Sequence, residues 1–114
     1  MSVVTNVLIL APLIEESPED TYPAIDALNA KLAEHEKGSF VEIGKHAGGR
    51  KAFEACVFAA AINYLDLDWF RECIESVPWV SRDEVQVLVC PQSDETFSLF
   101  YGTMDRRAEE TNIE

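Results

Sequence analysis

Basic residues are scarce in this chain of 114 residues, where 9 Lys and Arg stand against 21 Asp and Glu and leave a formal net charge of −12. Such a surface repels the phosphate backbone of nucleic acids, whose binding rests on contacts from Lys and Arg. It attracts proteins with basic surfaces, most strongly at low salt. We therefore expect no nucleic-acid partner and favour a basic protein partner, although the same charge also serves solubility.

Long hydrophobic runs are also missing. The longest, residues 7–14 and 55–62, fall far short of the roughly 18 residues that a membrane-spanning helix needs. Residues 1–6 carry no basic side chain, which a signal peptide has before its apolar region. We therefore expect no contact with a membrane and no export.

Paired cysteines are missing as well. The three cysteines, Cys56, Cys73 and Cys90, stand in apolar stretches and form no CxxC or Cys/His cluster. Unpaired buried thiols persist in a reducing compartment, whereas a secreted domain of this size more often carries disulfides. Together with the missing export signal, this pattern predicts a cytoplasmic protein.

Motifs of enzymes and of cofactor sites are absent. The sequence has no GxSxG, no HExxH, and neither glycine pattern of a P-loop or a dinucleotide fold. Asp66 and Asp68 lack further oxygen ligands nearby, so we interpret them as helix-capping residues and not as a cation site. We expect no cofactor, no metal and no catalytic residue, while an acid–base role for His46 with distant partners stays an alternative.

The N-terminal part predicts a strand followed by a helix. Residues 3–11 are mostly β-branched and aliphatic, which is typical of a buried strand. Residues 17–20, Ser-Pro-Glu-Asp, suit a helix start. Apolar residues then recur at spacings of three and four over residues 22–36, with Pro23 tolerated in the first turn and Gly38 as the left-handed stop.

The middle of the chain predicts a hairpin. Residues 40–43 form a short strand, and Gly48 and Gly49 are a favoured two-residue turn. Residues 51–65 are ambiguous, because three consecutive alanines suit a helix while apolar side chains alternate as in a strand. The turn, and a fresh helix start at Asp66, favour the strand.

The remaining elements complete an α+β pattern. Residues 67–77 predict a helix, and residues 85–90 and 97–101 predict a second hairpin. The order βαββαβ(β) is typical of the ferredoxin-like class, a mainly antiparallel sheet with two helices on one face. We expect a single domain over residues 1–102 and a polar tail over residues 103–114.

One segment has the opposite charge to the rest of the chain. The predicted hairpin tip combines glycine backbone N–H groups with basic side chains, which suits a phosphate or carboxylate of a nucleotide or phosphorylated metabolite. Solvation of an ordinary hairpin tip explains the same residues, and this alternative stays open. The predicted ligand-binding residues are Lys45, His46, Gly48, Gly49, Arg50 and Lys51.

The charge balance favours a non-enzymatic protein-binding module of the inhibitor, immunity or anti-defence type, acting on a basic partner surface. A tryptophan in the loop after the second helix is a candidate anchor, because Trp is frequent at interface hot spots. The predicted partner-binding residues are Glu15, Glu16, Glu19, Asp20, Trp79, Asp94 and Glu95.

Three short runs, residues 46–49, 63–68 and 78–79, read His-Ala-Gly-Gly, Asn-Tyr-Leu-Asp-Leu-Asp and Pro-Trp. In these runs the chain resembles a family of small uncharacterised acidic proteins of actinobacteria and their phages. The resemblance covers about the central third of the chain. It implies a cytoplasmic bacterial or phage setting and no particular activity.

Overall fold

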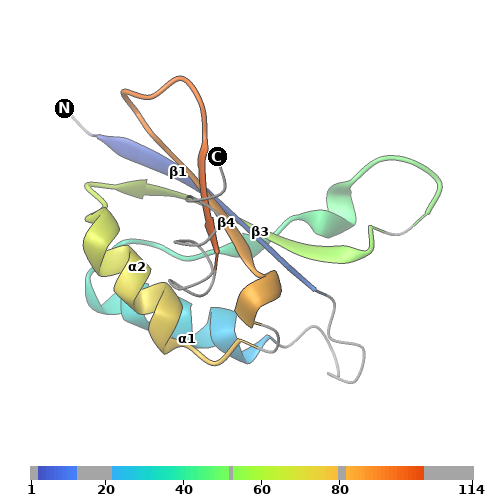
Figure 1. Ribbon diagram of the computed structural model, residues 1–114, viewed down its shortest axis with the longest axis horizontal. Helices are drawn as coiled ribbons and strands as arrows, with labels where there is room; N and C mark the ends of the chain where they lie inside the picture. The colour runs from blue at the N-terminus through green and yellow to red at the C-terminus, as the bar shows by residue number, and fades with distance from the viewer. Residues whose placement is uncertain (1–2, 13–21, 52, 80–81, 102–114) are drawn as a thin grey trace.

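The computed structural model describes residues 3–12, 22–51, 53–79 and 82–101, which form an α+β fold of five strands and two helices (Figure 1). The elements in chain order are β1 (Val4–Pro12), α1 (Pro23–Glu34), β2 (Val41–Glu42), β3 (Ala55–Asn63), α2 (Leu67–Ser76), β4 (Gln86–Pro91) and β5 (Ser98–Tyr101). Residues 44–46 and 82–84 form 3₁₀ turns. The prediction of a strand within residues 51–65 is confirmed, because β3 lies there.

The strands form one sheet in the order β2-β3-β1-β4-β5, and each neighbouring pair is antiparallel. β3 lies between β1 and β2, the strands that α1 connects. β1 in turn lies between β3 and β4, the strands that α2 connects. Both helices pack on the same face of the sheet, as Figure 1 shows.

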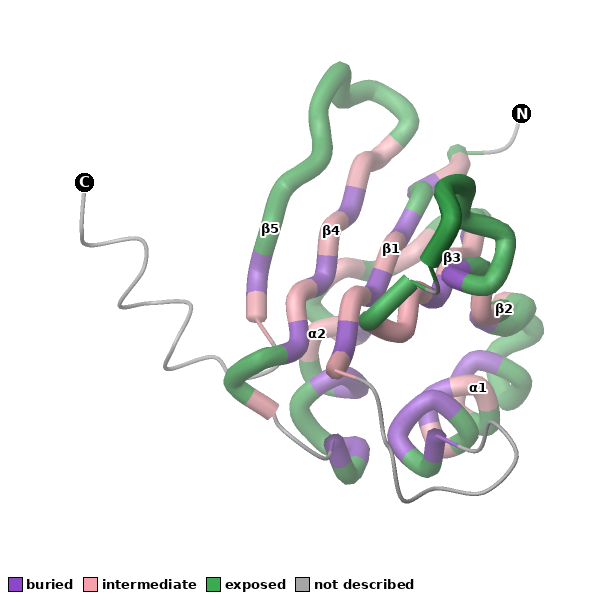
Figure 2. The backbone as a smooth tube through the Cα atoms, turned by 90° about the vertical axis from the view of Figure 1, so that its right-hand side faces the viewer, coloured by how far each residue is buried: buried purple, intermediate pink, exposed green. Residues whose placement is uncertain are grey.

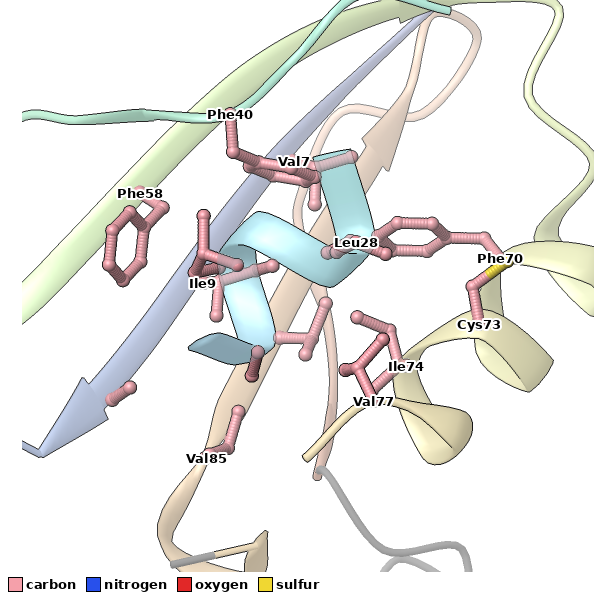
Figure 3. Close-up of a cluster of buried hydrophobic side chains, with 14 of the residues drawn as sticks. Val7, Ile9, Leu28, Phe40, Phe58, Phe70, Cys73, Ile74, Val77 and Val85 are labelled. Carbon is pink, nitrogen blue, oxygen red and sulfur yellow. The ribbon is translucent and has the colours of Figure 1, made fainter. Parts of the chain in front are cut away.

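The core fills the space between that face and the helices. Along β1 buried and more exposed residues alternate (Figure 2), and the buried Val7 and Ile9 have exposures of 1% and 0%. Leu28 of α1 and Phe70 of α2 meet them from the other layer (Figure 3). The period of two in the strands and the spacing of three and four in the helices thus bury their apolar sides together.

The end of α1 differs from the prediction. Glu36, and not Gly38, is the first residue with a left-handed backbone, at φ 55°. The N–H of Glu36 donates to the carbonyl of Ala33, and the N–H of Lys37 donates to the carbonyl of Leu32 at 2.9 Å. This pair of bonds is a Schellman motif, which satisfies two carbonyls at the helix end despite the absence of glycine at this position.

The connection between β2 and β3 also differs from the prediction. Val41 pairs with Ala59 and Glu42 with Phe58, and the paired segment ends there. A two-residue turn at Gly48 and Gly49 would continue the pairing to the neighbours of the glycines, so that prediction is wrong. Instead, residues 43–54 make a long connection that begins with a 3₁₀ turn and projects from the body in Figure 1.

Other sequence predictions fall elsewhere. The tail at residues 103–114, the helix start at 17–20 and the acidic residues Glu15, Glu16, Glu19 and Asp20 lie outside the described residues. Cys73 is buried, while Cys56 and Cys90 are partly buried, and none of the three is in a disulfide. Within the described ranges, no helix has both the length and the apolar character that crossing a membrane requires.

Candidate functional site

The sheet face opposite the helices, called the open face below, is mainly apolar, with Asn6, Asn63 and Gln86 among its polar members, although no described element lies over it. It consists of the strand residues that alternate with the core residues. These are Val41 of β2, Ala55, Val57, Ala59, Ala61 and Asn63 of β3, Val4, Asn6, Leu8 and Leu10 of β1, Gln86, Leu88 and Cys90 of β4, and Leu99 and Tyr101 of β5. None of these positions carries a charged side chain.

One row of the open face crosses all five strands. The register places Val41, Ala59, Leu8, Leu88 and Leu99 side by side from β2 to β5. Side chains directly opposite one another on neighbouring strands lie about 4.5 to 5.5 Å apart, so the row is one continuous aliphatic band. Its two ends are well exposed, at 60% for Val41 and 46% for Leu99.

A groove of about 410 Å³ runs along the open face beside this row. Leu8, Ala59, Ala61 and the polar Asn6 line it together with Phe97, which is 45% exposed. The hollow lies where β3 carries alanines, because a methyl side chain leaves space above the strand. Larger residues on β1 and on the β4–β5 connection form the sides of this space. The result is a shallow surface with a small-residue half on β3 and a large-residue half on β4 and β5.

An open sheet face of this composition is unusual. Antiparallel sheets with one face in water usually alternate apolar residues toward the core with polar residues toward solvent. Contiguous exposed apolar surfaces of this kind mark sites of interaction. The open face is therefore the main candidate functional site, and the signal that could have found it is the unbroken apolar run Val7–Leu10, which is typical of a strand covered on both sides.

The outer side of α2 is acidic. Asp68, Glu72 and Glu75 are exposed and stand four and three residues apart, so they share one side of the helix. Asp66 caps the helix, because its Oδ1 accepts hydrogen bonds from the N–H groups of Asp68 at 3.1 Å and of Trp69 at 3.3 Å. The interpretation of Asp66 as a helix cap is thus confirmed, and the acidic side is called the α2 stripe below.

The C-terminal end of α2 is held by Arg82, a contact that the sequence did not predict. Arg82 donates from Nη1 to the carbonyl of Glu75 at 2.7 Å and from Nη2 to that of Val77 at 2.8 Å. These bonds satisfy carbonyls that have no partner within the helix. The arginine lies several residues beyond the helix, so no local spacing rule predicts the contact.

Trp79 does not lie on the surface. It is 8% exposed, its Nε1 donates to the carbonyl of Ile74 at 2.7 Å, and its ring packs edge-on against Tyr22. The prediction of an exposed Trp79 anchor is therefore wrong, because the chain after α2 folds back under the helix and buries the indole. Asp94 and Glu95 are exposed in the β4–β5 connection, on a different segment from the α2 stripe.

The predicted ligand-binding residues lie in the β2–β3 connection, where the six of them, Lys45, His46, Gly48, Gly49, Arg50 and Lys51, are all exposed. Glu42 holds the base of the connection, since its Oε2 accepts from the N–H of Gly44 at 3.0 Å and from that of Val57 at 3.3 Å. The cations thus stand on a projecting segment, and the anionic-ligand site stays a prediction.

Two groups of the helix layer have raised pKa values. Burial raises the pKa of the Tyr22 hydroxyl to about 12, and Cys56 adds a smaller contribution in the same direction. Burial also raises the pKa of the Cys73 thiol. Lys31 lowers this pKa by a smaller amount, and Glu72 and Glu34 add smaller contributions that raise it. Both groups are thereby kept neutral, which suits a structural role in the core.

Comparisons with protein-family models, with curated proteins and with solved structures found no match for this chain. The resemblance to the actinobacterial and phage family therefore stays a prediction.

Proposed function

We propose that this protein is a non-enzymatic protein-binding module, of the inhibitor, immunity or anti-defence type, that binds a basic surface on another protein. The observation that carries the proposal is the division of its exterior. The helix layer presents the acidic α2 stripe, while the open face is mainly apolar and uncharged. Segregated surfaces of these two kinds are suited to recognition by charge and by apolar contact respectively.

The α2 stripe is the surface that a basic partner would contact. Asp68 and Glu72 are like charges four residues apart, an arrangement that disfavours a helix by a few tenths of a kcal/mol. Asp68 offsets part of this cost as an acid in the first turn, and Arg82 supplies a cation at the other end of the helix. The like-charge pair keeps a small local cost in stability, for which partner recognition offers a reason.

We also propose the ferredoxin-like class for the fold. The element order and the position of β3 between β1 and β2 support it. Such folds host many unrelated functions, so the class adds no argument about activity. The basic connection between β2 and β3 is the alternative site, for a nucleotide or phosphorylated metabolite. The exposure of its cations is explained equally well by binding of such an anion and by ordinary solvation of a projecting segment. Protein binding is therefore the function proposed.

Affinity capture with a matched pair of variants tests the function. One bait carries Asp68→Lys and Glu72→Lys in the α2 stripe, and its control carries Glu34→Lys and Glu36→Lys, which change the net charge equally at exposed positions at the end of α1 and just beyond it. From an actinobacterial lysate at low salt, the unmodified protein and the control should retain the same basic protein, and the α2 bait should lose it. High salt should release it, because exposed charge contacts are screened.

Two results would contradict this proposal. The first is equal retention of the partner by both variants, which would remove the α2 stripe from the interface. The second is retention that high salt leaves unchanged, which would exclude a charge-based contact. Circular dichroism on the α2 bait checks that the helix is kept, because its two lysines repeat the like-charge spacing of the pair they replace and Asp68→Lys removes the acid of the first turn.

A further inference from the structure

No described element of the chain covers the open face. β1 carries apolar side chains toward both faces, with Val7 and Ile9 under the helices and Leu8 and Leu10 on the open side. Removing apolar surface from water is favourable in proportion to its area. A face of this kind is therefore stabilised by whatever molecule covers it.

We infer that a second copy of this chain covers the open face, giving a twofold dimer with the two sheets face to face and the two helix layers outward. This inference builds on the proposed function, since the dimer would display two α2 stripes on opposite sides. It concerns a different surface, so each can fail without the other.

Charge selects a second copy over a basic partner at this face. Each chain has a net charge of −12, yet the open face has no charged side chain, so two copies can meet there without placing carboxylates in contact. A basic partner would find no acid to pair with on this surface. The tail at residues 103–114 is a poor occupant by composition, because only Met104, Ala108 and Ile113 are apolar in it.

The row across the sheet is self-complementary. A twofold axis along β1 places β3 of one copy over β4 of the other and β2 over β5, because the strand order is β2-β3-β1-β4-β5. Ala59 then faces Leu88 of the second copy, and Val41 faces Leu99. The small half of each face thus meets the large half of the other, which is the condition for close packing between two sheets.

The area of the open face is close to what this contact needs. One strand residue covers about 16 Å² of a sheet, given the spacing along and between strands. β1 and β3 have nine residues each and β4 has six. They cover about 400 Å² when flat. Side-chain relief, the outer strands and Phe97 bring the accessible area toward the roughly 600 Å² per partner at which specific interfaces begin.

Salt gives the dimer a distinctive signature. The two acidic bodies repel each other while the interface itself is uncharged, so added salt should strengthen the dimer by screening. Sedimentation velocity on the full chain should show the mass of two chains at high protein concentration. The dissociation constant should fall as salt rises from about 0.01 M to about 1 M, where the Debye length falls from about 30 Å to about 3 Å. Binding to a basic partner responds to salt in the opposite direction.

A matched pair of variants locates the interface. Leu99→Glu and Ala33→Glu add the same charge, the first on the open face and the second on an exposed position of α1. The first should raise the dissociation constant by more than about tenfold, because it buries an unpaired carboxylate, and the second should leave it nearly unchanged. Val41→Lys, at a 60% exposed position that folding tolerates, should weaken the dimer like Leu99→Glu.

Mixing Val41→Lys with Leu99→Glu tests the twofold arrangement. Each variant should be a monomer alone, and the mixture should recover a dimer, because the lysine of one chain then faces the glutamate of the other. A mixture that stays monomeric overturns the arrangement.

Other results overturn the inference itself. One is an unmodified chain that stays monomeric at high protein concentration and high salt. Another is equal dimerisation of Leu99→Glu and Ala33→Glu. If a chain ending at residue 101 dimerises while the full chain does not, the tail is the occupant. If Leu99→Glu abolishes capture of a basic protein while the α2 bait retains it, the open face belongs to that partner.

Discussion

The two faces of the single sheet use neighbouring residues in opposite ways. Ile9 and Leu8 are adjacent aliphatic residues of β1, yet Ile9 is fully buried beneath the helices while Leu8 belongs to the open face. Alternate residues of β1 thus lie in the covered core and on an uncovered face of similar aliphatic character. An aliphatic residue in a strand therefore has no fixed role, because the layer placed over it decides whether it serves stability or recognition.

A second contrast separates charge from apolar surface. The α2 stripe is acidic, and the open face across the sheet is free of charge in the described strands. This separation is what lets one small chain offer two independent contacts with opposite responses to salt. The proposed dimer would place the apolar surfaces inside and the acidic ones outside.

The largest test of the contrast between faces is truncation on β1. Ile9→Ala should lower the free energy of unfolding by about 2 to 5 kcal/mol, since it leaves a cavity in a closed core. Leu8→Ala should lower it by less than about 1 kcal/mol in the monomer, because that side chain already contacts water. Urea unfolding at low salt and low protein concentration measures both. Equal losses would show that the open face is covered within the monomer.

A smaller effect is the pH dependence of the free energy of unfolding, to which the buried Tyr22 hydroxyl on the helix side contributes. The Tyr22 hydroxyl has an ordinary pKa of 10.0 and a folded-state pKa of about 12. The unfolded chain therefore releases its proton first, and the stability is full below about pH 10 and is lost as pH rises toward 12. Tyr22→Phe should reduce this loss in urea unfolding between pH 8 and pH 11. A variant with the parental pH dependence would assign the alkaline loss to other groups.

The smallest effect leaves stability unchanged and concerns thiol reactivity. Cys73 is a buried residue of α2 and burial raises its pKa, whereas Cys90 lies on the open face and is partly exposed. In dilute protein at pH 8, iodoacetamide should label Cys90 at least about ten times faster than Cys73, as peptide mapping by mass spectrometry would show. At high protein concentration the dimer should slow labelling of Cys90 alone. Equal rates would mean that the helix layer opens readily.

Local patterns predicted most of the elements. The spacing of three and four around Leu28, the Asp66 cap and the alternation through Phe58 correspond to α1, the start of α2 and β3. These signals are local because a helix or a strand is decided by neighbouring residues within one or two turns. The acidic character likewise follows from composition.

Long-range packing explains the failures. Trp79 was expected on the surface because Pro78 precedes it in a loop, but its indole bonds to Ile74 and contacts Tyr22, a residue far away in sequence. Glu36 adopts a left-handed backbone without glycine because two carbonyls of α1 require partners. Gly48 and Gly49 suited a tight turn, yet the pairing of β2 with β3 ends before reaching them.

By itself the sequence determined the acidic charge and the order of helices and strands, because each depends on composition or on residues close together in the chain. Only the tertiary structure decided that Val41, Ala59, Leu8, Leu88 and Leu99 form one uncovered row. That row exists through pairing between strands far apart in sequence. Which of the two apolar sides of β1 stays open depends on where both helices pack.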